Sequence, residues 1–357
     1  MQRCLYNLYF IKNKTTFFVT VILLLTPISL LSGQKQCDFV DVYGTNLITS
    51  ELICELFYED INKLRHWAAS EDIDTITKFL KLNDSIADRL KSMGPFSEVS
   101  VSPIVYLNRQ VFITIDFLEI KDKQIRTGFY AEPQETISGT DTLLEQWMKY
   151  AREVHHLFAT NPKSLNFSSC PGFHCLGGFE HPLLVEYGKI FVRDVPTQTD
   201  ALIKVLRRDK DPFKRASAVY LLAYTNDLNV LIKALVPSIR DPNSLVRNNV
   251  MRVLSVALLM PKGINEHLPL TEIVAALNFP SVSDRNKALC IVWSLSQHKT
   301  YAEYFTKHAG IRLVTLLKMK QPNIHDISYD ILKRFSGKDY DERNYGAWDK
   351  WAKDAAG

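Results

Sequence analysis

The sequence lacks the short motifs that most often mark an enzyme. Its 357 residues contain no G-x-S-x-G, no P-loop, no G-x-G-x-x-G and no H-E-x-x-H. It also lacks a concentrated basic block, and a net charge of +4 over this length gives no argument for nucleic acid or anionic lipid as a partner. With 46% hydrophobic and 23% charged residues, the composition is that of a globular protein. We therefore expect a globular, non-catalytic protein that needs no cofactor.

Long apolar runs are also scarce, and only the N-terminus has one. Lys12 and Lys14 precede an uncharged stretch that ends in the small residues Ser32 and Gly33. This pattern predicts a signal peptide over residues 1–33 and a periplasmic or extracellular protein. The alternative is an uncleaved inner-membrane anchor over residues 16–33, which would then be the protein's membrane contact.

Cysteines are few, and export changes their interpretation. Five remain after the leader, so at least one lies outside any intrachain pair. In an oxidising compartment Cys170 and Cys175, close in sequence, are predicted to form a disulfide. Cys37 with Cys54 is left open as a second pair. Cys290 lies in an apolar run and is predicted to be a buried thiol.

Residues 38–120 have the pattern of a small α+β module. A short strand ending in Gly44 precedes two segments with helical spacing, with Ser50 as the expected N-cap of the first. Two strand patterns follow, and residues 111–118 alternate with a period of two. The predicted order is strand, helix, helix, strand, strand. With "VDVYGTNLITSELI", "GPFSEVSVSP" and "VFITIDFLE", this order resembles a POTRA domain, which implies a role in polypeptide transport or outer-membrane assembly.

Residues 121–195 are interpreted as a connecting region. They include an amphipathic helix that begins near Asp141 and the Cys/His-rich stretch "CPGFHCLGGFEH". The apolar stripe expected on that helix consists of Leu144, Trp147, Met148, Ala151 and Val154.

Residues 196–357 consist of helical segments that recur in pairs. Segments starting at Asp211-Pro212, Asp241-Pro242, Ser281 and Gln321 each follow another apolar helix, at a spacing of roughly 30 to 43 residues. Aspartate can cap such a helix, and proline is tolerated in its first turn. Paired helices of this kind must stack to bury their apolar faces.

This half resembles HEAT or armadillo-type repeat proteins, which implies an all-α solenoid. Arg215, Arg247 and Arg285 stand near the position where HEAT units carry a basic residue, and Asp326 is assigned to that position in the fourth segment. The tail "SGKDYDERNYGAWDKWAKD" resembles the C-terminal end of bacterial HEAT-repeat proteins. Its two tryptophans, at positions 348 and 351, are expected to cap the last repeat.

The basic residues of the repeats have two interpretations. Arg215, Arg247, Arg252 and Lys287 could line a concave groove that binds an acidic partner. Alternatively, the arginines form an internal ladder and bond turn aspartates such as Asp211 or Asp241. The recurrence of aspartates in register with the arginines favours the ladder.

The Cys/His-rich stretch also permits a metal site. His155, His174, Cys175 and His181 offer nitrogen and sulfur ligands of the kind that zinc binds. The spacing lacks the two separated ligand pairs of structural zinc sites, so a disulfide-stapled loop is the favoured reading.

The sequence thus predicts an exported scaffold that binds a protein or peptide through a HEAT-like solenoid. Two alternatives stay open. One is a metal-dependent hydrolase built on the histidine and cysteine cluster, and the other is an envelope-assembly factor that acts through the POTRA-like module.

Overall fold

A computed structural model describes residues 37–356 except 71, 107, 166–169 and 260–267. The predicted leader at residues 1–33 lies outside the described residues. The chain divides into two compact units, one of residues up to 122 with 319–321, and one of residues 123–318 with 322–357. Among the residues that the structure describes, no helix is both long and apolar enough to cross a membrane.

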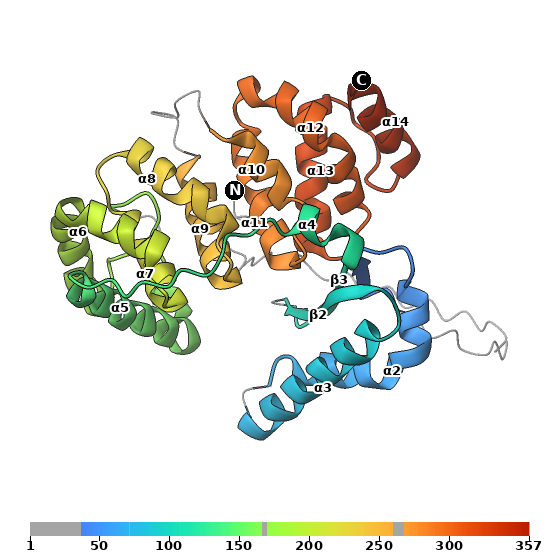
Figure 1. The fold of residues 1–357 in the computed structure, drawn as a ribbon, viewed down its shortest axis with the longest axis horizontal. Helices are drawn as coiled ribbons and strands as arrows, with labels where there is room; N and C mark the ends of the chain where they lie inside the picture. Colours follow the sequence, from blue (N-terminus) through green and yellow to red (C-terminus); the bar gives the residue numbers. More distant parts are fainter. Residues whose placement is uncertain (1–36, 71, 107, 166–169, 260–267, 357) are drawn as a thin grey trace, which may run out of the picture. The chain divides into compact units, whose positions relative to one another are not determined.

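The first unit contains a three-stranded sheet and two helices in the predicted order (Figure 1). The elements are β1 (Val40–Tyr43), α2 (Ser50–Trp67), α3 (Ile73–Lys91), β2 (Phe96–Val105) and β3 (Val111–Glu119). The strand order is β1-β3-β2, with β1 parallel and β2 antiparallel to β3. This confirms the small α+β unit at the N-terminus.

The core of this unit lies between the sheet and helices α2 and α3. Ile113, Ile115 and Phe117 project from β3 into one apolar cluster with Ile53 and Ile61 of α2, and all five are fully buried. One detail of the prediction is wrong. The N-cap of α2 is Thr49, whose side chain accepts a hydrogen bond from the backbone N–H of Leu52, and Ser50 is the first helical residue.

The second unit is helical. Its principal helices are α4 (Lys123–Arg126), α5 (Asp141–Thr160), α6 (Pro182–Arg208), α7 (Pro212–Leu222), α8 (Leu228–Leu235), α9 (Ser244–Ala257), α10 (Leu270–Ala276), α11 (Val282–Leu295), α12 (Lys299–Leu317), α13 (Pro322–Ser336) and α14 (Tyr345–Ala356). Short 3₁₀ segments are η1 (Ile120–Asp122) in the first unit, and η2 (Pro162–Ser164) and η3 (Val236–Arg240) in the second. The helix pairs expected from residue 196 onward are present. Helix α6 runs without a break through Pro196, where the sequence analysis placed a boundary.

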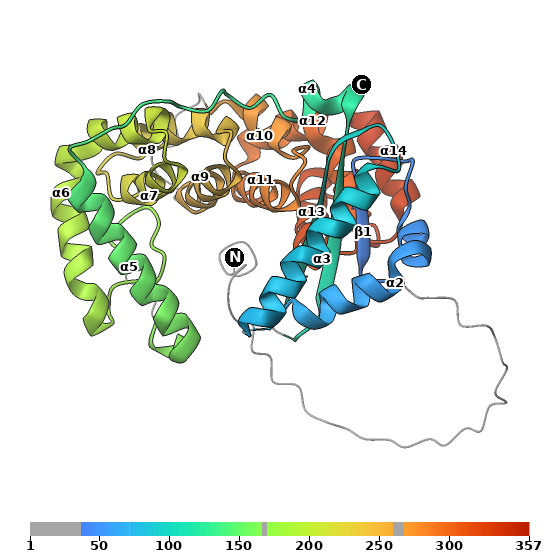
Figure 2. The ribbon, with the colours of Figure 1, turned by 60° about the horizontal axis from the view of Figure 1, so that its bottom comes forward.

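Helices α7, α9, α11 and α13 pack against one another in chain order, and Figure 2 shows the first three side by side. The packing is close on all sides of α11, because every residue of this helix except Ser283 is buried. Cys290 lies in this helix, buried and in neither cysteine pair.

The apolar stripe of α5 differs from the predicted one at Met148 and at Ala151, which is only half-buried. The buried residues of α5 are Leu143, Leu144, Trp147, Tyr150, Val154 and Leu157. Met148 is 45% exposed. Residues 143, 147, 150, 154 and 157 recur at helical spacing and form the buried face of α5, and Met148 lies at the edge of this face.

Candidate functional site

Helices α7, α9 and α11 each carry an arginine as their fourth residue, and each arginine bonds the turn before its own helix. The Nη1 group of Arg215 donates to the carbonyl oxygens of Asp209 and Lys210, at 2.9 and 3.3 Å. Arg247 repeats this with residues 241 and 242, both at 2.8 Å. Arg285 repeats it with residues 279 and 280, at 2.9 and 3.0 Å. Each arginine therefore closes its own turn by satisfying carbonyl groups that no helix uses.

Two of these arginines also reach forward to the next turn or helix. The Nε and Nη2 groups of Arg215 bond the two carboxylate oxygens of Asp241, each at 2.9 Å. Arg247 bonds Asp284 through Nε at 2.9 Å and Nη2 at 2.8 Å. All four side chains are buried, so these are charge-assisted bonds shielded from water. The ladder interpretation thus describes Arg215 and Arg247, and neither lines an open groove.

The two aspartates named in the ladder interpretation, Asp211 and Asp241, have different roles. Asp211 caps α7 by accepting a hydrogen bond from the backbone N–H of Phe213 at 2.8 Å. Asp241 instead serves the ladder, and Asn243 is the N-cap of α9. In the fourth helix of the series the fourth residue is His325, which contacts the carbonyl oxygen of Leu317 through Nδ1 at 2.6 Å. The prediction that Asp326 occupies the arginine position is therefore wrong by one residue, because His325 lies there.

An extended segment, residues 127–140, covers the ladder. Its backbone bonds the ends of two helical segments: the N–H of Tyr130 donates to the carbonyl oxygen of Arg240, and the N–H of Glu135 donates to that of Arg208. Figure 2 shows this segment running alongside the helices from α12 to α8. Glu132 contacts Arg215 at 3.3 Å, and the guanidinium of Arg247 lies 3.9 Å from the ring centroid of Phe129. The chain itself therefore occupies the surface beside the ladder.

Sequence reasoning did not find this segment. The stretch around Pro133 has no helical or strand period, and proline also disfavours helix at the residue before it. This pattern predicts an extended chain. It does not indicate which residues the chain contacts, because these lie in turns more than 70 residues away in the sequence.

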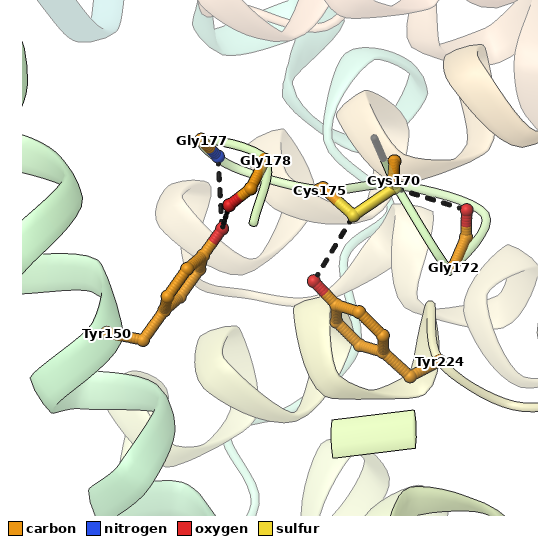
Figure 3. Close-up of a disulfide and its surroundings, with 7 residues drawn as sticks. All are labelled: Tyr150, Cys170, Gly172, Cys175, Gly177, Gly178 and Tyr224. Atoms are coloured by element: carbon orange, nitrogen blue, oxygen red, sulfur yellow. Dashed lines mark hydrogen bonds between the residues drawn. A yellow bond between two sulfur atoms is a disulfide. The ribbon is translucent and has the colours of Figure 1, made fainter. Parts of the chain in front are cut away.

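The Cys/His-rich stretch forms a stapled loop over α7. Cys170 and Cys175 are joined with their Cα atoms 5.6 Å apart (Figure 3). The hydroxyl of Tyr224 donates to Cys175 Sγ at 3.4 Å. On the other side, the hydroxyl of Tyr150 accepts from the N–H of Gly177 at 3.1 Å and donates to the carbonyl of Gly178 at 3.5 Å. Cys37 and Cys54 form a second pair at disulfide distance, with Cα atoms 6.1 Å apart.

The four residues of the metal alternative are not brought together. Cys175 is held by Cys170, and His181 caps α6 by accepting from the N–H of Leu183. His155 bonds the carbonyl of Ala151 in its own helix, and His174 is buried against Tyr220. Across the described ranges of the chain, no group of three histidine, cysteine, aspartate or glutamate side chains is arranged to hold a metal ion.

His174 is the loop residue with the most unusual environment. It is 8% exposed, and its ring centroid lies 5.4 Å from that of Tyr220. Burial, followed by the positive charges of Arg252 and Lys287, lowers the pKa of His174 to about 3. Arg252 and Lys287, the two remaining residues of the sequence-predicted groove, therefore lie close enough to His174 for their charges to act on it.

This environment predicts an acid-sensitive fold. The unfolded chain binds a proton on His174 near pH 6.5, and the folded chain does so only near pH 3. The stabilisation is complete above pH 6.5 and is lost between these values as the pH falls. In urea denaturation, the wild type should lose about 2 kcal/mol more than His174→Gln between pH 7.5 and about pH 5. Equal losses in the two proteins would contradict the assignment.

An open cavity of about 650 Å³ lies beside α5. Its lining includes Met148, Arg152 and His155 of α5 and Ser217 of α7. Trp147, also part of the lining, stacks on Tyr220 at a centroid distance of 4.8 Å. The cavity and the Cys/His-rich loop thus share the face of α7 that carries Ser217 and Tyr220.

Comparisons with known proteins do not assign the chain to a family. No protein-family model matches the sequence, and searches of the curated proteins and of the solved structures find no similar chain.

Proposed function

We propose that this protein is an exported scaffold that binds a protein or peptide on a HEAT-like α-solenoid. The observation that carries the proposal is the arginine pattern. Arg215, Arg247 and Arg285 occupy the same place in α7, α9 and α11 and make the same pair of bonds to the preceding turn. Identical bonding in consecutive units is what a stacked repeat produces, and stacked repeats present long surfaces for partners.

We expect the binding surface on the face opposite to the ladder turns, because the polar groups of those turns already have hydrogen-bond partners within the chain. Residues 127–140 occupy the side of the ladder, which leaves no room there for a second chain to make the same bonds. The cavity beside α5 offers exposed Met148 and polar Arg152 and His155. A hollow of mixed apolar and polar lining suits a side chain or short segment of a partner.

Export is supported by the cysteines. Two pairs at disulfide distance favour an oxidising compartment, either periplasmic or extracellular. A leader over residues 1–33, or an inner-membrane anchor over residues 16–33, would bring the protein there.

A second candidate rests on the first unit. Its element order and its β1-β3-β2 sheet are compatible with a POTRA-like module, and β2 is an edge strand of ten residues to which a client strand could be added. The protein would then act as an envelope-assembly factor.

Site-specific photo-crosslinking in the exporting cell tests the proposal. A benzophenone amino acid is placed at Met148 in the cavity, and as a matched control at Ile311, which is 55% exposed on α12 and does not line the cavity. We expect one defined protein to be crosslinked at position 148 and not at 311. Crosslinking at neither position, or at 311 alone, would contradict this surface, and crosslinking only from a probe on β2 would favour the envelope-assembly candidate.

A further inference from the structure

The open cavity beside α5 has a preformed wall. Helices α5 and α7 lie alongside each other (Figure 1, Figure 2). They are joined by the ion pair of Lys214 with Asp141 at 2.7 Å and by the stacking of Trp147 on Tyr220. Trp147 is buried and also lines the cavity, so its ring is held in place before anything binds. A partner therefore does not have to order this wall, which lowers the cost of binding.

The exposed side of α5 adds an apolar group and a cation to the cavity lining. Met148 is 45% exposed, and Arg152 is exposed as well. Arg152 follows Met148 by about one helical turn, so the two side chains lie on one face of α5. Among the described residues, Arg152 forms neither a hydrogen bond nor an ion pair. Its guanidinium group therefore has its N–H donors available for a partner.

The other polar side chains of α5 in the cavity lining do not neutralise Arg152. Glu145 precedes Lys149 by four residues, the order in which glutamate and lysine attract each other on a helix. It is about 10 Å from Arg152 along the helix axis, because each residue of a helix advances about 1.5 Å. His155 donates through Nδ1 to the carbonyl oxygen of Ala151 at 2.6 Å and carries no negative charge. The cavity thus combines an apolar surface with an unpaired cation.

We propose that this cavity takes an extended acidic segment of the partner, with an apolar residue and a glutamate or aspartate two positions apart. Met148 and Arg152 are separated by about 6 Å along the helix axis. Two residues of an extended chain advance about 6.6 Å, and their side chains project on the same side. The apolar side chain then contacts Met148 and Trp147, and the carboxylate bonds the guanidinium of Arg152. Aromatic, methionine and arginine side chains are the residues enriched in the centres of protein interfaces.

This inference rests on the proposed function, since it names the chemistry of the segment by which the partner is held. It also fixes the source of the carboxylate. The occupant crosses the face of α5 and offers a side-chain carboxylate, so its own chain ends play no part.

Fluorescent pentapeptides with blocked ends test the segment by anisotropy on the full chain. Each has leucine at its second position and glutamate, glutamine or lysine at its fourth, with glycine elsewhere. We expect the glutamate peptide to bind about three- to fivefold more tightly than the glutamine peptide, as for an exposed ion pair, and the lysine peptide to bind most weakly. Serine in place of leucine should weaken the glutamate peptide. A glutamate peptide that binds no better than the glutamine peptide, or no worse with serine, would overturn the inference.

A charge reversal assigns the preference to one side chain. In Arg152→Glu the order should reverse, so that the lysine peptide binds most tightly. The control Arg343→Glu makes the same change at an exposed position outside the cavity, and should keep the wild-type order. A glutamate preference that persists in Arg152→Glu, or that is lost equally in both variants, contradicts the site.

A milder variant keeps the test valid if Arg152→Glu is unstable. Arg152→Gln adds no negative charge, and it should melt like the wild type because Arg152 is exposed and has no partner among the described residues. It should remove the difference between the glutamate and glutamine peptides. An unchanged difference would show that Arg152 does not bind the carboxylate.

Crosslinking at Met148 separates this inference from the proposed function. If the peptides show no glutamate preference while a probe at Met148 still crosslinks one defined protein, the acidic segment is wrong and the proposed function stands. If both results are negative, both are wrong.

Discussion

Arg215→Met is expected to lower the free energy of unfolding by about 3–5 kcal/mol. The substitution removes both bonds to Asp241 and the bonds that close the turn at residues 209 and 210. It leaves the carboxylate of Asp241, which is 5% exposed, buried beside an apolar side chain. Urea denaturation followed by helical circular dichroism measures the change.

Two controls separate the ladder from other effects of charge. Arg208→Met breaks a surface pair with Glu135, whose side chains are 57% and 46% exposed, and should cost less than about 1 kcal/mol. The double variant Arg215→Met, Asp241→Leu removes the whole pair and should recover much of the stability. A single variant as stable as the wild type would show that the ladder does not hold the turns.

Trp348→Ala is expected to destabilise the helical unit by about 3–5 kcal/mol. Trp348 is fully buried in α14, which packs against α12. Its Nε1 donates to the carbonyl oxygen of Asp341 at 3.1 Å, and its ring lies edge-on to those of Tyr329 and Tyr340. Removal of the indole opens a cavity between α14 and α12, which the fixed packing of these helices cannot close completely.

Trp351→Ala is the matched control for this prediction. The two rings are in edge contact with centroids 6.1 Å apart, but Trp351 is only half-buried and lies over Gly310 of α12. We expect a loss clearly smaller than that of Trp348→Ala in the same denaturation experiment. Similar losses at the two positions would mean that the exposed face of α14 contributes as much to the free energy of unfolding as its buried face.

Periodicity in the sequence predicted most helices and strands, but not the continuation of α6 through Pro196. Alternation in residues 111–118 predicted β3, and Asp-Pro with apolar spacing predicted α7 and α9. Local rules also assigned the caps, but only approximately. Thr49 and Ser50 have nearly equal capping ability, so the sequence alone could not choose between them.

Long-range relations were harder to predict. The ladder could be anticipated because arginine and aspartate recur in register, yet the cover provided by residues 127–140 could not. Likewise, Arg252 and Lys287 were grouped with Arg215 and Arg247 as one basic set. The structure separates the two pairs, because Arg215 and Arg247 bond the turns before their helices, whereas Arg252 and Lys287 act on the charge of His174.

Hydrogen exchange of residues 127–140 tests most directly whether this segment covers the ladder and leaves the cavity side for a partner. The amides of Tyr130, Glu135 and Ile137 donate to the turns or to Asp209. We expect these amides to exchange as slowly as amides in the helices, and faster in Arg215→Met. Exchange at the rate of an unfolded peptide in the wild type would contradict it, since the ladder face would then be open.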